Sequence, residues 1–336
     1  MGKTFDIALV GCGGVSPMHL DGYVRHPERV RVVAACDLDP ARARAAAERW
    51  KIPAVFSSVE EMIAGASWEV AAVCTPTPVR EAVVRALAAA GKHLFVEKPL
   101  ADSYEEACRM VTACQDAGVK LAVDQNFRYH YPFDQARALI AEGRIGKLVG
   151  ITNYDLQFRQ DRGWRVQSPR HTLSVMGIHW LDGFRWLLGC EARSLLCRTH
   201  RSPAIDCVGE TDAVMQIAFE NGVTVSYTQS FSSPLATTRT LILGEAGMLA
   251  LDYDGLALFV RGAAHSPAEQ WANPYAGPNK PESAFIGLNH LLTALETGGE
   301  PPNSGQDNLC TVALLDAAYR SAAKDRLISF EGGLPV

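Results

Sequence analysis

Lys98 is the residue of this sequence with the clearest chemical potential, and it lies in the run Phe-Val-Glu-Lys-Pro at residues 95–99. A primary amine can take a proton from an alcohol while the adjacent carbon loses a hydride. A lysine with an ordinary pKa of about 10.4 is a poor base at neutral pH, so this role needs partial desolvation or a positive charge nearby. The alternative is a structural lysine that pairs with Glu97 or with a phosphate.

A glycine-rich turn lies between the first apolar run and a helix expected to begin near Pro17. It contains Gly11, Cys12, Gly13, Gly14 and Val15. At such a junction Gly11 permits a tight turn, and Gly13 lets a pyrophosphate approach the backbone. Asp37 ends the second apolar run, where a carboxylate can accept hydrogen bonds from ribose hydroxyls. These residues predict a dinucleotide site, with an ordinary turn between strand and helix as the alternative.

The same segments indicate which cofactor is expected. Asp37 favours NAD over NADP, because a carboxylate repels a 2′-phosphate. Arg42 and Arg44 follow in the next helix and could weaken that preference, although a solvated helix face explains them more simply. Thr75 and Pro76 end a later apolar run, and we expect them beside the nicotinamide ribose unless they form a plain turn. Glu97 and Lys98 are expected at this same cofactor-binding edge.

The elements that must position these residues alternate between strand and helix. Apolar runs predict strands at Asp6–Val10, Arg31–Cys36, Val70–Cys74, His93–Val96 and Lys120–Val123. Segments rich in alanine and glutamate predict helices at Ala41–Trp50, Val79–Ala90 and Tyr104–Ala117. Ser103 and Glu106 have the spacing of a capping box, while Gly91 and Gly118 follow two helix ends. Repeated strand–helix–strand units require a covered parallel sheet, so an α/β fold with a Rossmann domain over residues 1–123 is predicted.

From residue 124 onward the pattern predicts an α+β domain over residues 124–336. Expected strands are Leu148–Phe158, Asp212–Glu220, Val223–Phe231, Thr240–Leu243, Met248–Asp252 and Leu256–Val260. Expected helices are Phe133–Glu142, Leu173–Leu188, Ser283–Thr297 and Gln306–Lys324, and residues 267–281 are expected to form a long loop. Asn221-Gly222 and Asp254-Gly255 are hairpin signals, so an open, mostly antiparallel sheet is predicted. Its uncovered face predicts a homodimer or homotetramer.

Composition narrows the classes of function. The net charge of −5 and the lack of a basic stripe argue against nucleic-acid binding. The nine cysteines include no C-x-x-C pair, so neither a disulfide framework nor a metal site is expected. No apolar run approaches the ~18 residues of a membrane span, and the first run is too short for a signal sequence. We therefore expect a cytoplasmic protein without membrane contact.

The order of these motifs resembles that of the Gfo/Idh/MocA oxidoreductase family, named for glucose–fructose oxidoreductase and inositol dehydrogenase. The resemblance spans the chain and rests on residues 11–14, His19, Asp37, Thr75-Pro76, Glu97-Lys98-Pro99 and Gly177-Ile178-His179. It implies a Rossmann domain joined to a domain with an open sheet, and NAD(P)-dependent oxidation or reduction of sugars, polyols and related compounds. It also implies that Lys98 is the catalytic lysine and His179 its partner.

Four further residues are candidates for substrate contacts. Asn126 and Arg128 resemble the Asn-x-Arg segment of the family, and Trp164 and Arg165 match a place where relatives put substrate contacts. An indole face suits the C–H side of a sugar ring, and a guanidinium suits hydroxyl clusters or an acid. Arg128 could equally bind backbone, and the segment around Trp164 could equally be a charged surface loop.

The sequence departs from the family pattern at Val175, where many relatives carry an aspartate one helical turn before the histidine. Valine cannot accept a hydrogen bond, so the usual Lys–Asp–His relay is not available. Asp182, three residues after His179, can orient the imidazole or form a structural salt bridge. Either the lysine and histidine suffice, or hydride chemistry is altered, or another group supplies the acid, such as His171, Asp155 or Asp161.

Three functions remain open at this point. The leading hypothesis is an NAD(P)-dependent dehydrogenase that acts on a CH–OH group of a sugar, polyol or sugar-acid derivative. A second hypothesis is an isomerase or lyase that oxidises its substrate transiently with tightly bound NAD and has no net redox change. A third is a nucleotide-binding ligand sensor without turnover, which Val175 favours and the retained Lys98 and His179 oppose.

Overall fold

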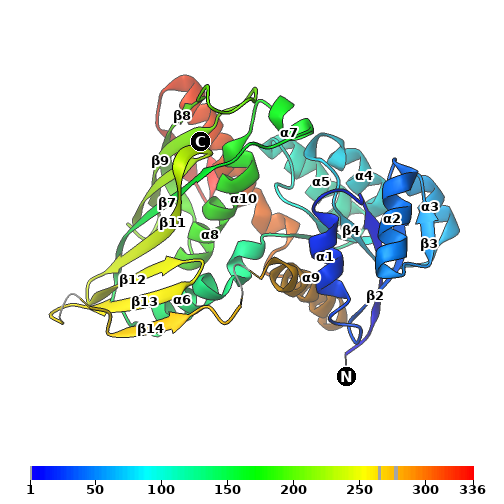
Figure 1. Cartoon of the computed structure of the whole chain (residues 1–336), viewed down its shortest axis with the longest axis horizontal. Helices are drawn as coiled ribbons and strands as arrows, with labels where there is room; N and C mark the ends of the chain where they lie inside the picture. The colour runs from blue at the N-terminus through cyan, green and yellow to red at the C-terminus, as the bar shows by residue number, and fades with distance from the viewer. Residues whose placement is uncertain (1, 264–265, 276–278) are drawn as a thin grey trace. The chain divides into compact units, whose positions relative to one another are not determined.

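The structure is a computed structural model that describes residues 2–263, 266–275 and 279–336. Two compact units make up the chain (Figure 1). Unit 1 comprises the residues up to Asn126 together with Lys280–Val312, and unit 2 comprises Phe127–Asn279 and Ala313–Val336. The sequence interpretation assigned all residues after 123 to the second domain. The chain instead returns to unit 1 for one helix and the start of another.

Unit 1 is built on a six-stranded parallel sheet with the order β3-β2-β1-β4-β5-β6. Its strands are β1 (Phe5–Val10), β2 (Val30–Cys36), β3 (Ala54–Phe56), β4 (Val70–Val73), β5 (His93–Val96) and β6 (Leu121–Val123). The strand order reverses between β1 and β4, and in such sheets ligands bind outside the carboxyl ends of the strands at this point. The predicted Rossmann fold is confirmed.

Helices cover both faces of this sheet. They are α1 (Ser16–Tyr23), α2 (Pro40–Trp50), α3 (Val59–Gly65), α4 (Thr77–Ala89), α5 (Tyr104–Asp116), α9 (Lys280–Thr297) and the first part of α10 (Gly305–Lys324). Side chains along β1 alternate between two hydrophobic clusters, as the period of a strand requires. Ile7 and Leu9 pack with residues of α1 and α9, whereas Ala8 and Val10 pack with residues of α4 and α5.

The local signals that set these helix ends are seen in the structure. Ser103 and Glu106 form the predicted capping box at the start of α5. Gly91 and Gly118, after α4 and α5, have φ angles of +70° and +66°, which glycine adopts without strain. The sequence interpretation missed β3 and α3. The three residues of β3 are too few to show the periodicity of a strand.

Unit 2 is built on a ten-stranded sheet with the order β14-β13-β12-β11-β7-β10-β9-β8-β15-β16. The strands are β7 (Leu148–Phe158), β8 (Ala192–His200), β9 (Asp212–Phe219), β10 (Thr224–Ser230), β11 (Ser232–Gly244), β12 (Gly247–Asp252), β13 (Gly255–Val260), β14 (Glu269–Ala272), β15 (Ile328–Glu331) and β16 (Leu334–Pro335). Both predicted hairpins are confirmed. Among the described strands, β7 and β10 form a parallel pair within an otherwise antiparallel sheet.

Several predictions for unit 2 need correction. The sequence interpretation missed β8 and β14–β16, and it took only the end of β11 as a strand. The segment expected as a loop over residues 267–281 contains β14, while residues 276–278 of it lie outside the described part of the chain. The helix predicted at Leu173–Leu188 begins instead as a π-helical turn at Leu173–Gly177 and continues as α8 (Ile178–Leu188).

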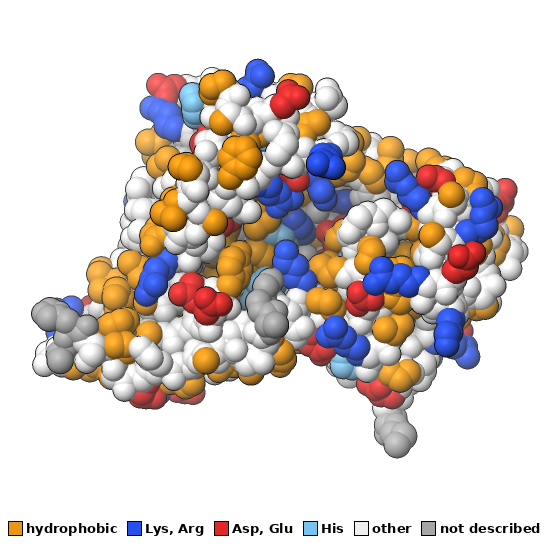
Figure 2. All heavy atoms as spheres, viewed as in Figure 1, with side chains coloured by type: hydrophobic (Ala, Val, Ile, Leu, Met, Phe, Trp, Pro, Cys, Tyr) orange, Lys and Arg blue, Asp and Glu red, His pale blue; other side chains and the backbone are white. Residues whose placement is uncertain are grey.

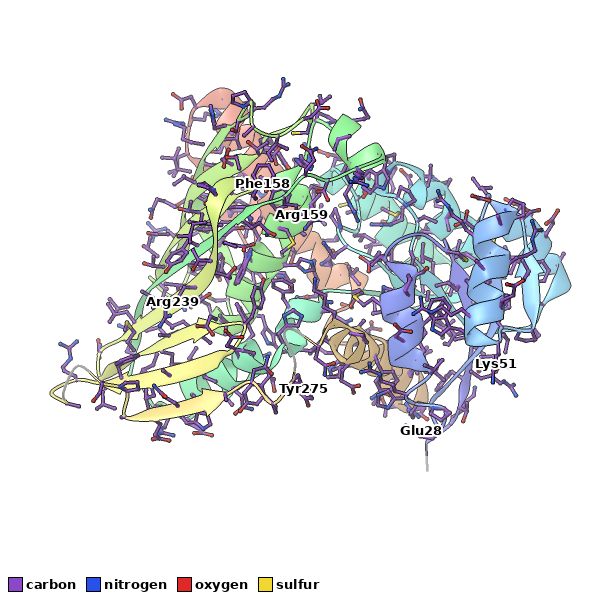
Figure 3. The ribbon with its side chains drawn as sticks, viewed as in Figure 1. Glu28, Lys51, Phe158, Arg159, Arg239 and Tyr275 are labelled. Atoms are coloured by element: carbon purple, nitrogen blue, oxygen red, sulfur yellow. The ribbon has the colours of Figure 1, made fainter. Side chains whose placement is uncertain are left out.

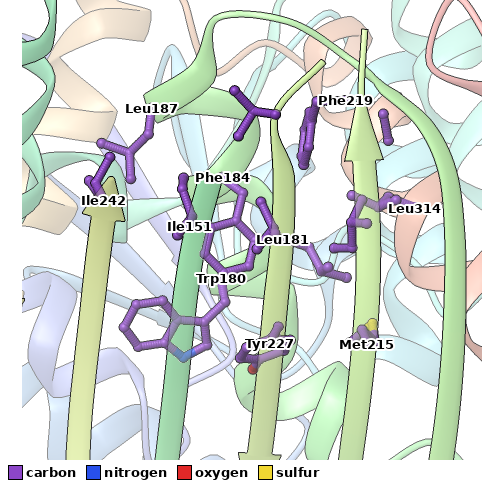
Figure 4. Packing of buried hydrophobic residues seen from close by; sticks show 14 of the residues in the cluster. Ile151, Trp180, Leu181, Phe184, Leu187, Met215, Phe219, Tyr227, Ile242 and Leu314 are labelled. Carbon is purple, nitrogen blue, oxygen red and sulfur yellow. The ribbon is translucent and has the colours of Figure 1, made fainter. Parts of the chain in front are cut away.

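The core of unit 2 lies between this sheet and α8, with α6 (Tyr131–Ala141) and the end of α10 alongside. Figure 4 shows Trp180, Leu181 and Phe184 of α8 packed over side chains from the central strands. Gly189 ends α8 with a left-handed φ of 62°, which glycine adopts without strain. On the face that Figure 2 presents, acidic and basic side chains are interspersed over both units. Among the described helices, none has the length and apolarity to span a membrane.

Candidate cofactor and catalytic residues

The glycine-rich turn follows β1 and leads directly into α1. Gly11 has a φ of +91°, and a Cβ on this residue would lie 2.9 Å from the backbone carbon and oxygen of Cys74. By contrast, a Cβ on Gly13 or Gly14 would meet no atom of the described chain within 4 Å. Gly11 is therefore needed for the fold, whereas Gly13 and Gly14 leave open space at the turn where a phosphate group would approach.

The amino end of α1 suits an anion. Val15 occupies the N-cap position, and no side chain caps the helix. The Ser16 hydroxyl donates to the Gly13 carbonyl at 2.8 Å and so fixes the turn. Backbone N–H groups at an uncapped helix start carry partial positive charge, which stabilises a bound phosphate. The residues present therefore fit the pyrophosphate of a dinucleotide.

Asp37 lies just beyond the end of β2 and connects two backbone segments. Its Oδ2 accepts a hydrogen bond from the N–H of Cys12 at 2.7 Å, and its Oδ1 accepts one from the N–H of Asp39 at 2.8 Å. A carboxylate oxygen has two lone pairs, so both oxygens can still accept a ribose hydroxyl. Nε of Arg42 lies 3.3 Å from a carboxylate oxygen of Asp39, and Arg44 is exposed.

Thr75 and Pro76 follow β4, as predicted, at the carboxyl edge of the sheet. The Thr75 hydroxyl is buried and has no hydrogen-bond partner among the described residues. A buried hydroxyl without a partner is costly, so a ligand group that bonds it would be favoured. Arg80 of α4 donates to the carbonyls of Thr75 and Pro99 and thereby ties the segment after β4 to the segment after β5. The sequence interpretation did not identify Arg80.

Lys98 follows β5, and Glu97 precedes it at the end of the strand. Glu97 is 6% exposed, and its Oε1 lies 2.7 Å from Nε2 of His19 on α1. Its Oε2 accepts the backbone N–H of Lys98 at 3.1 Å. Asp124, which follows β6, places its Oδ2 3.6 Å from the same His19 nitrogen. The ends of two strands and one helix thus surround a buried group of one imidazole and two carboxyls.

Electrostatics differ among the three members of this group. Burial disfavours the imidazolium, yet the polar and charged groups around the ring, Glu97 among them, raise the pKa of His19 well above its usual range. Burial also disfavours the Glu97 carboxylate, but the hydrogen bond and charge of His19 lower its pKa. Burial raises the pKa of Asp124 to about 7, with His19 opposing the shift and Glu97 adding to it.

The group has ligand types that metals use, and its nitrogen and oxygen atoms lie within 4.8 Å of one another. The 2.7 Å separation of His19 and Glu97 is that of a direct hydrogen bond. We therefore interpret the group as one that shares protons. Sequence reasoning marked His19 and Glu97 as family positions, but nothing in the local pattern around Asp124 could have singled it out.

Asn126 ends unit 1 and begins a short 3₁₀ turn, Asn126–Tyr129. Its side chain is 4% exposed, and Oδ1 is buried without a hydrogen-bond donor among the described residues. An amide oxygen in this state can accept a hydrogen bond from a substrate hydroxyl. The structure is thus compatible with the predicted substrate contact of Asn126.

His179 lies on α8 in unit 2 and is 5% exposed. Its ring stacks on Phe127, with 4.1 Å between the ring centroids and 9° between the planes. The neighbouring Trp180 donates from Nε1 to Asp155 at 3.1 Å, and Asp155 also accepts the hydroxyl of Thr238 at 2.7 Å. Asp155 therefore fixes the indole of Trp180 and the side chain of Thr238.

Arg128 and Asp182, which the sequence left with two possible roles each, form a buried pair. Nε and Nη2 of Arg128 donate to the two Asp182 oxygens, both at 2.6 Å, and both residues are at most 2% exposed. Arg128 also lies over the ring of Trp186, 5.1 Å from its centroid. This bidentate ion pair favours a structural role for both residues, over substrate binding by Arg128 and orientation of the imidazole by Asp182.

The other proposed sources of the missing acid form a separate network in unit 2. Asp161 lies 3.1 Å from Nε2 of His171 and accepts from Arg159, and these partners lower the pKa of Asp161 although burial opposes the shift. Glu210 accepts the backbone N–H groups of His171 and Leu173 at 3.0 and 2.9 Å. The network fixes the start of the π-helical turn that contains Val175.

Trp164 and Arg165 lie on a short helix, α7 (Trp164–Gln167), and not in the surface loop that was the alternative to a substrate contact. The indole of Trp164 is 40% exposed, and the guanidinium of Arg165 lies 5.6 Å from its centroid. Figure 3 labels Phe158 and Arg159 at the end of β7, from which the chain leads towards α7. An exposed indole beside a guanidinium is a surface that a sugar or a sugar acid can use.

Comparison with known proteins agrees with the geometry of both units. Residues 5–125 match a model described as the oxidoreductase family with an NAD-binding Rossmann fold, and residues 133–250 match a GFO/IDH/MocA C-terminal domain. The chain is 30% identical to a D-apiose dehydrogenase of Paraburkholderia graminis, over 98% of this chain and 90% of that protein. It is 31% identical to a D-apiose dehydrogenase of Rhizobium rhizogenes, over 96% of each.

A solved structure of an oxidoreductase from Agrobacterium radiobacter, in complex with NAD⁺, L-tartaric acid and magnesium, is similar over the whole chain. It is 27% identical, with a TM-score of 0.88, and the match covers 97% of this chain and 98% of that one. The likeness therefore extends over both units and is not limited to the common Rossmann sheet.

Proposed function

Since the chain belongs to the Gfo/Idh/MocA family of oxidoreductases, we propose that it is an NAD-dependent dehydrogenase of a sugar, polyol or sugar acid. One observation carries the proposal. Lys98 follows β5 at the carboxyl edge of the Rossmann sheet, next to the strand end that bears Thr75. This edge is where the fold holds a dinucleotide.

In this proposal, different residues of unit 1 hold different parts of the cofactor. The open space at Gly13 and Gly14 and the uncapped start of α1 receive the pyrophosphate, Asp37 accepts the adenosine ribose hydroxyls, and Thr75 bonds the nicotinamide side. When bound, the nicotinamide supplies the acceptor of the hydride. NAD is favoured over NADP, because Asp37 repels a 2′-phosphate and Arg42 is already beside Asp39.

Lys98 acts as the base in this proposal and His179 contacts the substrate. The neutral amine of Lys98 takes the proton of the reacting hydroxyl as the hydride leaves the carbon. The hydrogen bond from the Lys98 N–H to Glu97 holds the backbone from which this side chain extends. His179, stacked on Phe127, has a fixed ring that can bond a hydroxyl. Val175 supplies no acid to it.

The substrate class rests on two kinds of support. The similar proteins from Paraburkholderia and Rhizobium are named for a sugar, and the Agrobacterium structure contains a hydroxy acid. Trp164 and Arg165 supply an exposed ring face and a cation on unit 2, which suit these two chemistries.

Self-association belongs to the same proposal. The strands of the ten-stranded sheet alternate between buried and exposed side chains, so one face packs on the helices and the other carries exposed residues such as Val149 and Val214. We propose that this face pairs with a second copy. Light scattering should give a dimer or tetramer, and a monomer at high concentration would contradict the assembly.

The test is a panel of sugars, polyols and sugar acids assayed by nicotinamide absorbance with NAD and with NADP. Lys98→Met should abolish turnover and keep cofactor binding, while Lys147→Met, which replaces an exposed lysine of unit 2, should leave both unchanged. Product formation without a net change in absorbance would favour the isomerase or lyase instead. Cofactor binding without any reaction across the panel would overturn the dehydrogenase.

A further inference from the structure

The buried group of His19, Glu97 and Asp124 borders Lys98, and its one role so far is the hydrogen bond by which Glu97 holds the Lys98 backbone. The backbone N–H of Asp124 donates to Val96 at 2.8 Å, and that of Glu97 donates to Val73 at 2.9 Å. The carboxyl ends of β4, β5 and β6 are therefore locked together at this point. A group fixed this firmly can influence the lysine by charge without moving.

Glu97 is the ionised carboxylate of the group. Its Oε1 faces His19 at 2.7 Å and its Oε2 accepts the Lys98 backbone N–H, so both oxygens receive donors. Hydrogen bonds to the charged form are what keep a buried carboxylate ionised. The opposite nitrogen of the ring, His19 Nδ1, lies 3.2 Å from the hydroxyl of Tyr23.

Asp124 has no comparable support. Its Oδ2 lies 3.6 Å from His19 Nε2, which is too far for a good hydrogen bond, and its Oδ1 accepts none from the described residues. The side chain is 1% exposed. A carboxylate buried without donors neutralises itself by taking up a proton, and the rise of the pKa of Asp124 to about 7 agrees with this.

Titratable and charged groups reach the cluster from every side. They are His19 and Tyr23 of α1, Cys74 after β4, Arg80 of α4, and Glu97 and Lys98 after β5. The charge of Lys98 lowers the pKa of both carboxyls. Interaction between two groups is reciprocal, so the carboxyls must in turn raise the proton affinity of the lysine.

We propose that Asp124 is a positioning residue whose buried carboxyl shares a proton with Glu97 and sets the proton affinity of the Lys98 amine. The proposal deepens the dehydrogenase function and rests on it for its meaning in catalysis. When Asp124 is protonated, Lys98 loses its proton more easily and is ready to act as a base. When Asp124 is ionised, it stabilises the ammonium that forms after the lysine has taken the proton of the alcohol.

Asp124→Asn tests the inference because it keeps the shape and removes the ionisation. In the protein without cofactor, the rate at which acetic anhydride labels Lys98 is followed against pH by peptide mass spectrometry, which gives the pKa of Lys98 directly. We expect that pKa to fall by about one unit in the variant. Asp116→Asn, an exposed aspartate at the end of α5, should leave it unchanged.

An infrared titration of the unmodified protein supplies a second readout. The carbonyl stretch of a protonated carboxylic acid should disappear with a midpoint near pH 7, where burial places the pKa of Asp124 (about 7), and should be missing in Asp124→Asn. An unchanged Lys98 pKa in a folded Asp124→Asn variant would overturn the inference. So would the lack of that carbonyl band in the unmodified protein, which decides the matter even when the variant does not fold.

The proposal for Asp124 and the dehydrogenase proposal can be refuted independently of each other. Labelling and infrared spectra need neither substrate nor turnover, so they remain decisive when no compound of the panel reacts. If turnover is found, the acid limb of kcat/KM for oxidation should move to lower pH in Asp124→Asn by the same amount as the Lys98 pKa. A residue with a merely structural role would lower kcat without moving that limb.

Discussion

The glycine-rich turn allows stability and cofactor binding to be separated by two substitutions of the same kind. Gly11→Ala forces alanine into a φ of +91° and places its methyl carbon 2.9 Å from the backbone of Cys74. The backbone conformation costs about 1–2 kcal/mol. The contact costs about 1–3 kcal/mol more, since a backbone carbonyl cannot rotate away. We expect a loss of about 3 kcal/mol in the free energy of unfolding.

Gly13→Ala should instead leave the stability nearly unchanged and weaken cofactor binding. Its methyl group meets no atom of the described chain within 4 Å, and Gly13 is not among the glycines with positive φ. The change in unfolding free energy should therefore stay within about 1 kcal/mol, and it should favour the alanine variant. The methyl group nevertheless occupies the space that a pyrophosphate needs. We expect the Kd for NAD to rise at least about tenfold, which is about 1.4 kcal/mol.

Urea unfolding of the protein without cofactor measures the first effect, and quenching of tryptophan fluorescence by NAD measures the second. Gly91→Ala is the matched control, because Gly91 has a φ of +70° and an added Cβ there meets nothing within 4 Å. The free energy of unfolding of Gly91→Ala should fall only by the part that is due to backbone conformation. The reasoning is refuted if Gly11→Ala is as stable as Gly91→Ala, or if Gly13→Ala binds NAD with unchanged affinity.

Three other predictions concern charged residues. The pKa of Asp124 is raised from 3.8 to about 7 in the folded state, so the folded chain holds the proton longer. The free energy of unfolding therefore falls as the pH rises from 3.8 to about 7, by at most about 4 kcal/mol. Urea unfolding at these two pH values should show that Asp124→Asn lacks this loss. Asp182→Asn leaves Arg128 without its buried partner and should cost about 3–5 kcal/mol in thermal unfolding, with less cost when Arg128→Met is added. Asp37→Ser should lower the Kd ratio of NADP to NAD by about tenfold or more in fluorescence titrations.

The first half of the fold was predictable from sequence because its signals are local. Parallel strands buried on both faces appear as short apolar runs, and the capping box at Ser103 marks the start of a helix within four residues. Helix α9 is the exception. Its apolar face packs on α1, more than 250 residues earlier in the sequence, and on strands of the Rossmann sheet. No pattern within α9 specifies which sheet it covers.

The candidate site was predictable to the same extent. Lys98, Thr75 and Asp37 each follow a strand, so their place at one edge of the sheet follows from the alternation of strands and helices. Arg80 and Asp124 are different, since their roles depend on contacts with segments that no local motif links to them. Arg128 and Asp182 show the converse case, because residues with functional chemistry turned out to bond each other.

The contacts of three carboxylates in unit 2 bear on the valine at position 175. The family pattern would place an acid one turn before His179, but this chain has valine within a π-helical turn and holds Asp155, Asp161 and Asp182 with other partners. Each of those three carboxylates therefore stabilises another part of unit 2. The buried carboxyls that do remain next to a reactive group are Glu97 and Asp124 in unit 1. We therefore propose that proton transfer depends on the groups at the strand ends around Lys98, and that His179 binds the substrate.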